Sequence, residues 1–323
     1  MNFISKLTKI AVVTVLVTSL FSCSNDDEAG DIIEPGNSIA DFVADNENYS
    51  SLAAALDAAD LTASLDGDAN FTVFAPNNAA FNTFLSANGF ASLDEVPVEV
   101  LREILLYHVQ EGALMSSDLS TGYIESLAVG SASESNLSMY INTEDGVMIN
   151  GVSEVTNANI EVDNGVIHAV DAVIGLPDVT TFATADPNFS ILVQALTREE
   201  SFNFVETLQM TEDPAPFTVF APTNDAFASF LTEMEFESLA DIPTDVLAST
   251  LSYHVVTGGN FRSSDLTDGM MVTTFEGGDF TVNVGDNVTI TDVNERTSTV
   301  VAANVQANNG VIHVLDTVLL PEL

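Results

Sequence analysis

Three sequence motifs occur twice in this chain, each time in the same order, and this repetition limits the possible folds more than any other feature. The motifs are FTVFAP-x-N-x-AF at 71–81 and 217–227, Tyr-His-Val at 107–109 and 253–255, and NGVIH-x-x-D at 164–171 and 309–316. The first motif returns after 146 positions, an interval typical of a whole domain and too long for the unit of a solenoid. The sequence therefore predicts two consecutive copies of one globular domain.

Taken together, the three motifs resemble the signature segments of the fasciclin domain family. The resemblance extends over 38–177, which we call copy 1, and over 180–321, which we call copy 2. It implies an α+β fold with two consecutive fasciclin-like domains, each a wedge of β-strands packed with an α-helical bundle. It also implies a role in cell-surface or matrix adhesion, with no catalytic activity and no cofactor.

The first motif predicts a strand followed by a helix. Residues 71–74 alternate in the manner of a strand, Pro76 ends it, and Asn77 supplies a helix N-cap. Phe74 and Phe81 are then expected in the core, as are their counterparts in copy 2. The residues assigned to the structural framework by this motif and the closing motif are Phe74, Pro76, Phe81, His168, Asp171, Phe220, Pro222, Phe227, His313 and Asp316.

Copy 2 is longer than copy 1 ahead of this motif. Phe182 aligns with Phe42 at an offset of 140 positions, whereas Phe217 aligns with Phe71 at an offset of 146. About six residues are therefore inserted around 198–216, and we expect them in a loop.

The Tyr-His motif ends a predicted helix. Leu101, Ile104, Leu105 and His108 share one face of that helix, so the histidine ring lies at the C-terminal end of an apolar stripe. There the ring can cap free carbonyl groups, and the helix dipole favours a partly positive charge. This position favours a structural role, while the resemblance keeps an adhesive role open. The candidate binding residues of this motif are Tyr107, His108, Tyr253 and His254.

A second candidate binding site comes from the resemblance alone. In animal relatives of the family, an Asp-Ile pair shortly before the closing motif engages integrins. The matching residues here are Asn159 and Ile160 in copy 1 and Asn304 and Val305 in copy 2, so both copies lack the carboxylate. Integrin binding is therefore not supported, and the partner classes left open are a polysaccharide, a matrix protein and a second copy of the chain.

The closing motif predicts a β-hairpin, with the Asn-Gly pair at 164–165 as the central residues of its turn. In that turn both residues have positive φ, and the register places Glu161 opposite His168. In copy 2 the residue opposite His313 is Gln306. Because a carboxylate is present in one copy and not in the other, we interpret the pair as a cross-strand contact and not as an acid-base dyad.

The sequence contains none of the common catalytic or metal-binding motifs. There is no Gly-x-Ser-x-Gly elbow, no phosphate-binding glycine loop, no Cys-x-x-Cys and no His-Glu-x-x-His. The segment 66–70 spaces oxygen atoms like the start of a calcium loop, but Phe71 occupies the position that requires glycine. We therefore expect no enzymatic activity, no catalytic residue and no ordered metal site.

The N-terminal residues have the pattern of a bacterial lipoprotein signal. Two lysines precede an apolar run over 10–21, and the single cysteine, Cys23, follows at the position of the lipidated residue. We expect residues 1–22 to be the signal peptide, Cys23 to carry the acyl chains, and 23–37 to be an acidic flexible tether. The alternative is an ordinary signal peptide that is cleaved nearby.

Acidic residues dominate the charge of the chain. The formal net charge is −42, and both lysines precede Cys23, which leaves four arginines against 48 acidic residues after it. Such a surface repels phosphate backbones and anionic headgroups, so we expect no nucleic-acid partner and no membrane contact except through the lipid anchor. An acidic tether directly after the cysteine favours export to the outer surface of the bacterial outer membrane. The periplasmic face is the alternative.

These observations predict a non-enzymatic cell-surface lipoprotein that mediates adhesion, or binds extracellular matrix or polysaccharide, through two fasciclin-like domains. Two binding domains in series raise avidity. The alternative is a glycan-capture lipoprotein that serves an outer-membrane importer. A chain with no tryptophan and five tyrosines offers few aromatic platforms for that second role.

Overall fold

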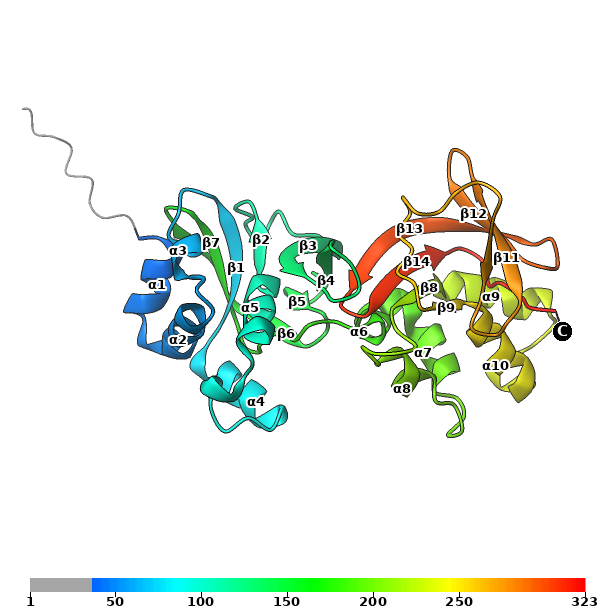
Figure 1. Ribbon diagram of the computed structural model, residues 1–323, viewed down its shortest axis with the longest axis horizontal. Coiled ribbons are helices and arrows are strands. Elements are labelled where there is room, and N and C mark those ends of the chain that lie inside the picture. Colours follow the sequence, from blue (N-terminus) through cyan, green and yellow to red (C-terminus); the bar gives the residue numbers. More distant parts are fainter. Residues whose placement is uncertain (1–36, 323) are drawn as a thin grey trace, which may run out of the picture. The chain divides into compact units, whose positions relative to one another are not determined.

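The computed structural model describes residues 37–322. The predicted signal peptide, Cys23 and the predicted tether up to residue 36 lie outside this range. Within it, each copy consists of helices and one seven-stranded sheet, which confirms the α+β class (Figure 1). No helix of the described range is both long enough and apolar enough to cross a lipid bilayer.

Copy 1 has five α-helices, two short 3₁₀ helices and seven strands. Its elements are α1 (Ile39–Asp45), η1 (Glu47–Tyr49), α2 (Ser50–Ala58), α3 (Thr62–Leu65), β1 (Phe71–Pro76), α4 (Asn78–Ala87), η2 (Leu93–Glu95), α5 (Val98–Tyr107), β2 (Val109–Glu111), β3 (Gly122–Val129), β4 (Asn136–Asn142), β5 (Met148–Ile149), β6 (Ser153–Val162) and β7 (Gly165–Val170).

Copy 2 repeats this order of elements. They are α6 (Val179–Ala185), η3 (Pro187–Phe189), α7 (Ser190–Leu196), α8 (Phe204–Leu208), β8 (Phe217–Pro222), α9 (Asn224–Glu233), η4 (Leu239–Asp241), α10 (Thr244–Tyr253), β9 (Val255–Thr257), β10 (Met270–Thr273), β11 (Asp279–Val284), β12 (Val288–Thr291), β13 (Thr297–Ala307) and β14 (Gly310–Leu315). The inserted residues lengthen the loops before and after α8, as the sequence predicts.

The two sheets have the same topology. Their strand orders are β2-β1-β7-β6-β5-β4-β3 and β10-β11-β12-β13-β14-β8-β9. The strand of the first motif lies parallel to the strand of the closing motif, β1 beside β7 and β8 beside β14, whereas the other neighbours are antiparallel. Two motifs that are distant in the sequence therefore meet on neighbouring strands inside each sheet, next to the short edge strand β2 or β9.

The strand and helix of the first motif form as the sequence predicts. Strand β1 is followed by helix α4, and the side-chain Oδ1 of Asn77 accepts a hydrogen bond from the backbone N–H of Ala80 at 3.0 Å. Such a cap satisfies one of the free N–H groups at the start of a helix. Phe74 and Phe81 are buried, as are Phe220 and Phe227.

The hairpin of the closing motif forms, but the predicted turn and register are wrong. The turn residues are Asp163 and Asn164, neither of which has positive φ, and Gly165 already belongs to β7. Glu161 therefore pairs with Val166, and a bulge in β6 separates it from His168. In copy 2, Gln306 pairs with Val311 and not with His313.

The reason for this register is that the Asn-Gly pair serves other contacts. The amide of Asn164 is buried; it accepts a hydrogen bond from Ile39 N–H at 2.8 Å and donates to the carbonyl oxygens of Leu65 and Gly67. It thereby holds the start of α1 and the end of α3 against the hairpin. Asn309 makes the equivalent three bonds in copy 2.

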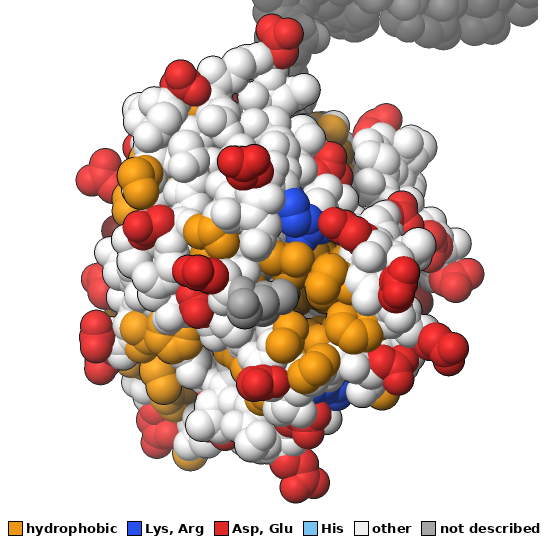
Figure 2. Space-filling view, turned by 90° about the vertical axis from the view of Figure 1, so that its right-hand side faces the viewer, with side chains coloured by type: hydrophobic (Ala, Val, Ile, Leu, Met, Phe, Trp, Pro, Cys, Tyr) orange, Lys and Arg blue, Asp and Glu red, His pale blue; other side chains and the backbone are white. Residues whose placement is uncertain are grey.

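Acidic side chains are spread over the face shown in Figure 2, where positive charge is scarce. The four arginines of the described range are partly buried; three of them bind main-chain or acidic groups, and Arg262 binds the side-chain amide of Gln306. Arg102 donates to the carbonyl oxygen of Ala59 at 2.9 Å, and Arg296 donates to Val318 and pairs with Glu233 at 2.6 Å. The surface is therefore strongly anionic, in agreement with the sequence.

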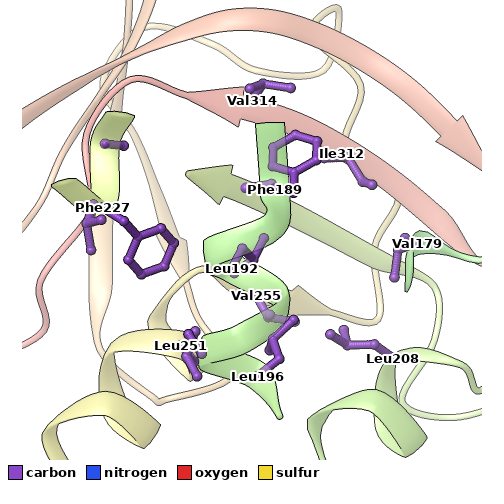
Figure 3. Packing of buried hydrophobic residues seen from close by; sticks show 14 of the residues in the cluster. Val179, Phe189, Leu192, Leu196, Leu208, Phe227, Leu251, Val255, Ile312 and Val314 are labelled. Carbon is purple, nitrogen blue, oxygen red and sulfur yellow. The ribbon is translucent and has the colours of Figure 1, made fainter. Parts of the chain in front are cut away.

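Each copy has two hydrophobic cores, one on each side of its central strands. In copy 1 the first core lies between the helices and the sheet, and the second lies inside the curved sheet around Phe74 and Tyr107. Copy 2 has the same pair of cores, and Figure 3 shows the packing on its helical side. This arrangement is the strand wedge packed with helices that the resemblance implies.

The helical core of copy 2 contains a small apolar cavity that its sequence explains. The cavity has a volume of about 30 Å³ and is lined by residues such as Val179, Ala183 and Phe189. The aligned residues of copy 1 are the larger Ile39, Val43 and Tyr49. Copy 2 has thus lost volume at three neighbouring positions, and an apolar cavity of this kind stays dry and costs stability.

We expect Ala183→Val to stabilise copy 2 by about 0.5 kcal/mol, because the added methyl groups fill the cavity while valine costs some helix propensity. Urea unfolding of the full chain measures the effect. The reverse change at the aligned position, Val43→Ala, is the matched control and should destabilise copy 1. An Ala183→Val chain that is less stable than wild type would contradict the assignment.

Candidate functional site

The Tyr-His motif lies in the interior of each copy. Tyr107 is fully buried at the end of α5; its hydroxyl donates to the carbonyl oxygen of Ser138 at 2.6 Å and accepts from Asn150 Nδ2 at 2.7 Å. Tyr253, at the end of α10, is equally buried and donates to the carbonyl oxygen of Asp279 at 2.6 Å. Tyr107 therefore connects α5 to β4, and Tyr253 connects α10 to the equivalent strand β11.

The following histidines cap these helices as neutral rings. Ile174 N–H donates to Nε2 of His108 at 2.9 Å, so the proton of the ring is on Nδ1, which donates to the carbonyl oxygen of Ile104 at 2.7 Å. His254 makes the same pair of bonds, with Leu319 and Thr250. Burial lowers the pKa of each histidine from 6.5 to about 4, although the bond to the carbonyl opposes the shift.

The predicted partial positive charge on these rings is therefore wrong, because the loss of hydration outweighs the attraction of the helix dipole. The predicted capping is confirmed by the bonds to Ile104 and Thr250. The side chains of Tyr107, His108, Tyr253 and His254 are at most 4% exposed. In the folded domain they offer almost no surface to a partner: the tyrosines tie each helix to a strand of its sheet, and the histidines tie it to the chain that follows the sheet.

The histidines of the closing motif are also used by the fold. The Nε2–H of His168 donates to the carbonyl oxygen of Leu114 at 3.0 Å, and that of His313 donates to Phe261 at 2.8 Å. Their rings stack on Phe74 and Phe220, with centroids 5.6 and 5.4 Å apart. Burial lowers the pKa of both rings, which keeps them neutral.

The aspartates of the closing motif fasten the two strands of the hairpin. The Oδ1 atom of Asp171 accepts a hydrogen bond from Glu154 N–H at 2.8 Å. In copy 2, Oδ1 of Asp316 accepts from Thr299 N–H at 2.7 Å. Both carboxylates thus serve structural contacts at the same place in the fold.

The residues that match the Asp-Ile pair of animal relatives lie in a bulge of the hairpin. Asn159 and Asn304 have left-handed backbones, with φ of 62° and 64°. The side-chain amide of Asn159 accepts from Ser116 N–H at 2.7 Å and donates to Ser116 Oγ at 3.0 Å, and Asn304 binds Ser263 in the same way. Ile160 is half-buried and Val305 is buried, so each pair points an apolar side chain inward.

We expect Asn159→Ala to destabilise copy 1 by about 1 to 2 kcal/mol, because alanine loses both bonds to Ser116 and tolerates positive φ poorly. Thermal unfolding followed by circular dichroism measures the loss. Asn159→Gly keeps the backbone freedom and removes the two bonds alone, so its effect should be smaller. Equal stability of wild type and the alanine variant would refute this role for the amide.

A pocket lies at the contact between the copies. It has a volume of about 450 Å³, and Tyr123 and Tyr140 of copy 1 line it together with Asp186 of copy 2. The hydroxyl of Tyr123 donates to Asp186 Oδ2 at 3.0 Å, and its ring packs edge-on against Phe182. The sequence does not indicate these residues, because neither tyrosine belongs to a repeated motif.

The described residues contain no grouping of three or more histidine, cysteine or acidic side chains that could hold a metal ion. The four histidines lie in four separate hydrogen-bonded positions, each with at least one ring nitrogen bound to the main chain. Their chemistry is that of neutral, buried structural groups.

Comparison with known proteins supplies the family. The model of the Fasciclin domain family matches residues 47–177 and again residues 187–321, most of the chain in total. The chain belongs to the fasciclin domain family. Fasciclin domains occur in adhesion and matrix-binding proteins, so membership supports a non-enzymatic role of the adhesion type.

Relatives of this fasciclin protein come from several groups of organisms. It is 36% identical over 145 residues to an uncharacterized protein of Synechocystis, an alignment that covers 45% of the chain and 98% of the relative. It is 27% identical over 277 residues to a fasciclin-like arabinogalactan protein of Arthroderma benhamiae, which covers 80% of the chain and 60% of the relative. It is 24% identical to the transforming growth factor-beta-induced protein ig-h3 of Sus scrofa, an alignment that covers 80% of the chain and 36% of the relative.

The chain therefore spans less than two thirds of the Arthroderma and Sus scrofa relatives. Among solved structures, it is similar to a FAS1 domain pair from the insect cell adhesion molecule Fasciclin I. That match has a TM-score of 0.48 and 19% identity and covers 87% of this chain and 95% of the other.

Proposed function

We propose that this protein is a non-enzymatic adhesion protein of the bacterial cell surface, anchored by lipid on Cys23. Its two fasciclin domains would bind an extracellular protein or a polysaccharide. The observation that carries the proposal is the family match over two segments, 47–177 and 187–321. The lipoprotein pattern of the N-terminal sequence supports the site of attachment.

The use of the polar residues agrees with a binding role. The histidines, which in an enzyme would be the first candidates for proton transfer, are buried and bound to the main chain. Two domains in one chain also increase the apparent affinity for a surface that presents many copies of a ligand. The anionic surface opposes binding to nucleic acid or to anionic lipids by charge.

Adhesion of cells tests the proposal. Cells that lack the gene should attach less to a matrix-coated surface than wild-type cells, and the full-length gene should restore attachment. A Cys23→Ala form should fail to restore it, since the protein would no longer be held at the cell. Equal attachment of cells with and without the gene on every surface tried would refute the adhesive role.

A further inference from the structure

The outer face of strands β10 to β13 in copy 2 is unlike the rest of the surface. Along these strands the side chains alternate, and Val272, Phe280, Val282 and Ile290 point into the core. The alternate positions point outward and carry mainly threonine. Apart from the Thr273–Asp279 pair at the margin, the outward residues, which we call the threonine face, are Met271, Thr281, Asn283, Thr289, Thr291, Thr297 and Thr299.

The strand register arranges these side chains in two rows. Met271 lies beside Thr281, Thr281 beside Thr291, and Thr291 beside Thr297, so one row crosses four strands. The second row runs from Asn283 through Thr289 to Thr299. Neighbours within a row are about 4.8 Å apart and the rows are about 7 Å apart, as the geometry of a sheet requires.

The threonine face carries no ionisable side chain, although the chain has 48 acidic residues. A carboxylate stands at its margin, where Asp279 accepts a hydrogen bond from Thr273 at 2.6 Å. Hydroxyl and amide groups both donate and accept hydrogen bonds. At the β10 edge, Met271 is 68% exposed and Phe275, in the following turn, is 47% exposed. The face therefore combines neutral polar groups with an apolar margin.

Copy 1 shows that this region of the fold is used for contact. Tyr123 and Tyr140 pair with each other as Met271 and Thr281 do, and Tyr140 is buried against the helical core of copy 2. Ser138 of the same strand accepts a hydrogen bond from Gln306 N–H of copy 2 at 2.9 Å. In copy 1 this face thus packs against the next domain, whereas in copy 2 no described residue covers the equivalent face.

The two faces differ in the chemistry they offer. The tyrosine pair, which receives the edge of Phe182 in copy 1, is replaced by Met271 and Thr281 in copy 2. The open face therefore lacks the aromatic pair against which another domain of this kind could pack. Its repeated hydroxyls instead match a partner that presents repeated hydroxyls of its own, and the surrounding acidic surface disfavours an anionic partner.

We propose that the threonine face binds a neutral polysaccharide. The threonine and asparagine side chains hydrogen-bond the hydroxyls of successive sugar units, and Met271 and Phe275 contact the C–H faces of the rings. This assignment rests on the proposed binding function and names its ligand class and its place in the fold. Copy 1 contributes no equivalent face, so the chain has a single face of this type within its described residues.

The test is sedimentation of the purified full chain with insoluble cellulose, chitin and starch, compared with anionic alginate beads. The disrupting variant is Thr281→Glu with Thr297→Glu, which places two charges in the first row. Neither hydroxyl makes a hydrogen bond within the described residues, so the fold should remain intact, as circular dichroism will verify. The matched control is Thr62→Glu with Thr211→Glu, which adds the same charge at exposed positions on helix α3 and in the loop after α8.

We expect wild type and control to bind at least one of the neutral polysaccharides, and the disrupting variant to bind it at least tenfold more weakly. Binding to alginate alone, binding to none of the three neutral polymers, or equal binding by both variants would overturn the proposal. So would a wild-type dimer, seen by sedimentation velocity, that the disrupting variant abolishes, because a second copy would then occupy the face. None of these results changes the cell-attachment experiment, which tests the adhesive role separately.

Discussion

Replacing Gly165 by alanine is expected to unfold copy 1. Gly165 opens β7 beside Phe71 of β1, and a Cβ atom at this position would lie 1.9 Å from the carbonyl oxygen of Phe71. The clashing oxygen belongs to the backbone of a strand inside the sheet, so no change of side-chain rotamer can relieve the clash. Gly165 also has a φ of 150°, a backbone conformation that residues with a side chain rarely adopt. We expect a loss of more than about 3 kcal/mol, a large part of the stability of a domain.

Urea unfolding of the full chain measures this loss. Four of the five tyrosines belong to copy 1, so near-ultraviolet circular dichroism reports mainly on that copy, while the far-ultraviolet signal reports on both. Gly175→Ala is the matched control, because no atom lies within 4 Å of a Cβ there. Gly310→Ala should affect copy 2 in the same way, since its Cβ would lie 2.4 Å from the carbonyl oxygen of Phe217. A Gly165→Ala chain with wild-type unfolding would refute the argument.

The glycine shows where the sequence was sufficient and where it was not. The repeated motifs predicted two domains, and the alternation around Phe74 with the cap at Asn77 predicted a strand and a helix, because these signals are local. The hairpin was predicted from its Asn-Gly pair, but its register was not. Asn164 is drawn inward by Ile39 and Leu65, which are about 100 or more positions away in the chain, and short-range turn rules contain no information on such contacts.

The candidate sites show the same limit. A histidine at the end of an apolar stripe was correctly placed as a cap, but its burial, and hence its pKa, depends on Ile174, 66 residues further along the chain. The threonine face was missed because its residues come from four strands, and no single strand contains more than two of its threonines. Their arrangement in rows depends on how the four strands pair, and this pairing cannot be read from the residues of any one strand.

Acidification from pH 7 to pH 5 is expected to destabilise the folded chain through its buried histidines. In the folded protein the pKa of His108 and of His254 is about 4, whereas the ordinary value is 6.5. Between these values the unfolded chain binds more protons than the folded chain, so stability falls as the pH falls. The contribution is complete above pH 6.5, and each histidine should cost about 2 kcal/mol by pH 5.

Urea midpoints at pH 7, 6 and 5 measure this slope, and histidine variants assign it. His108→Gln and His254→Gln remove a capping ring and should lower stability at pH 7, but each should also flatten the dependence on pH, which a merely disruptive change would not do. A residual slope is expected from His168 and His313, whose pKa values burial also lowers. Titration of the carboxylates acts in the opposite direction, because it relieves repulsion in a chain of net charge −42, and it sets in mainly below pH 5. A wild-type chain that is as stable at pH 5 as at pH 7 would refute the claim that burial holds the pKa of these two rings below the ordinary value.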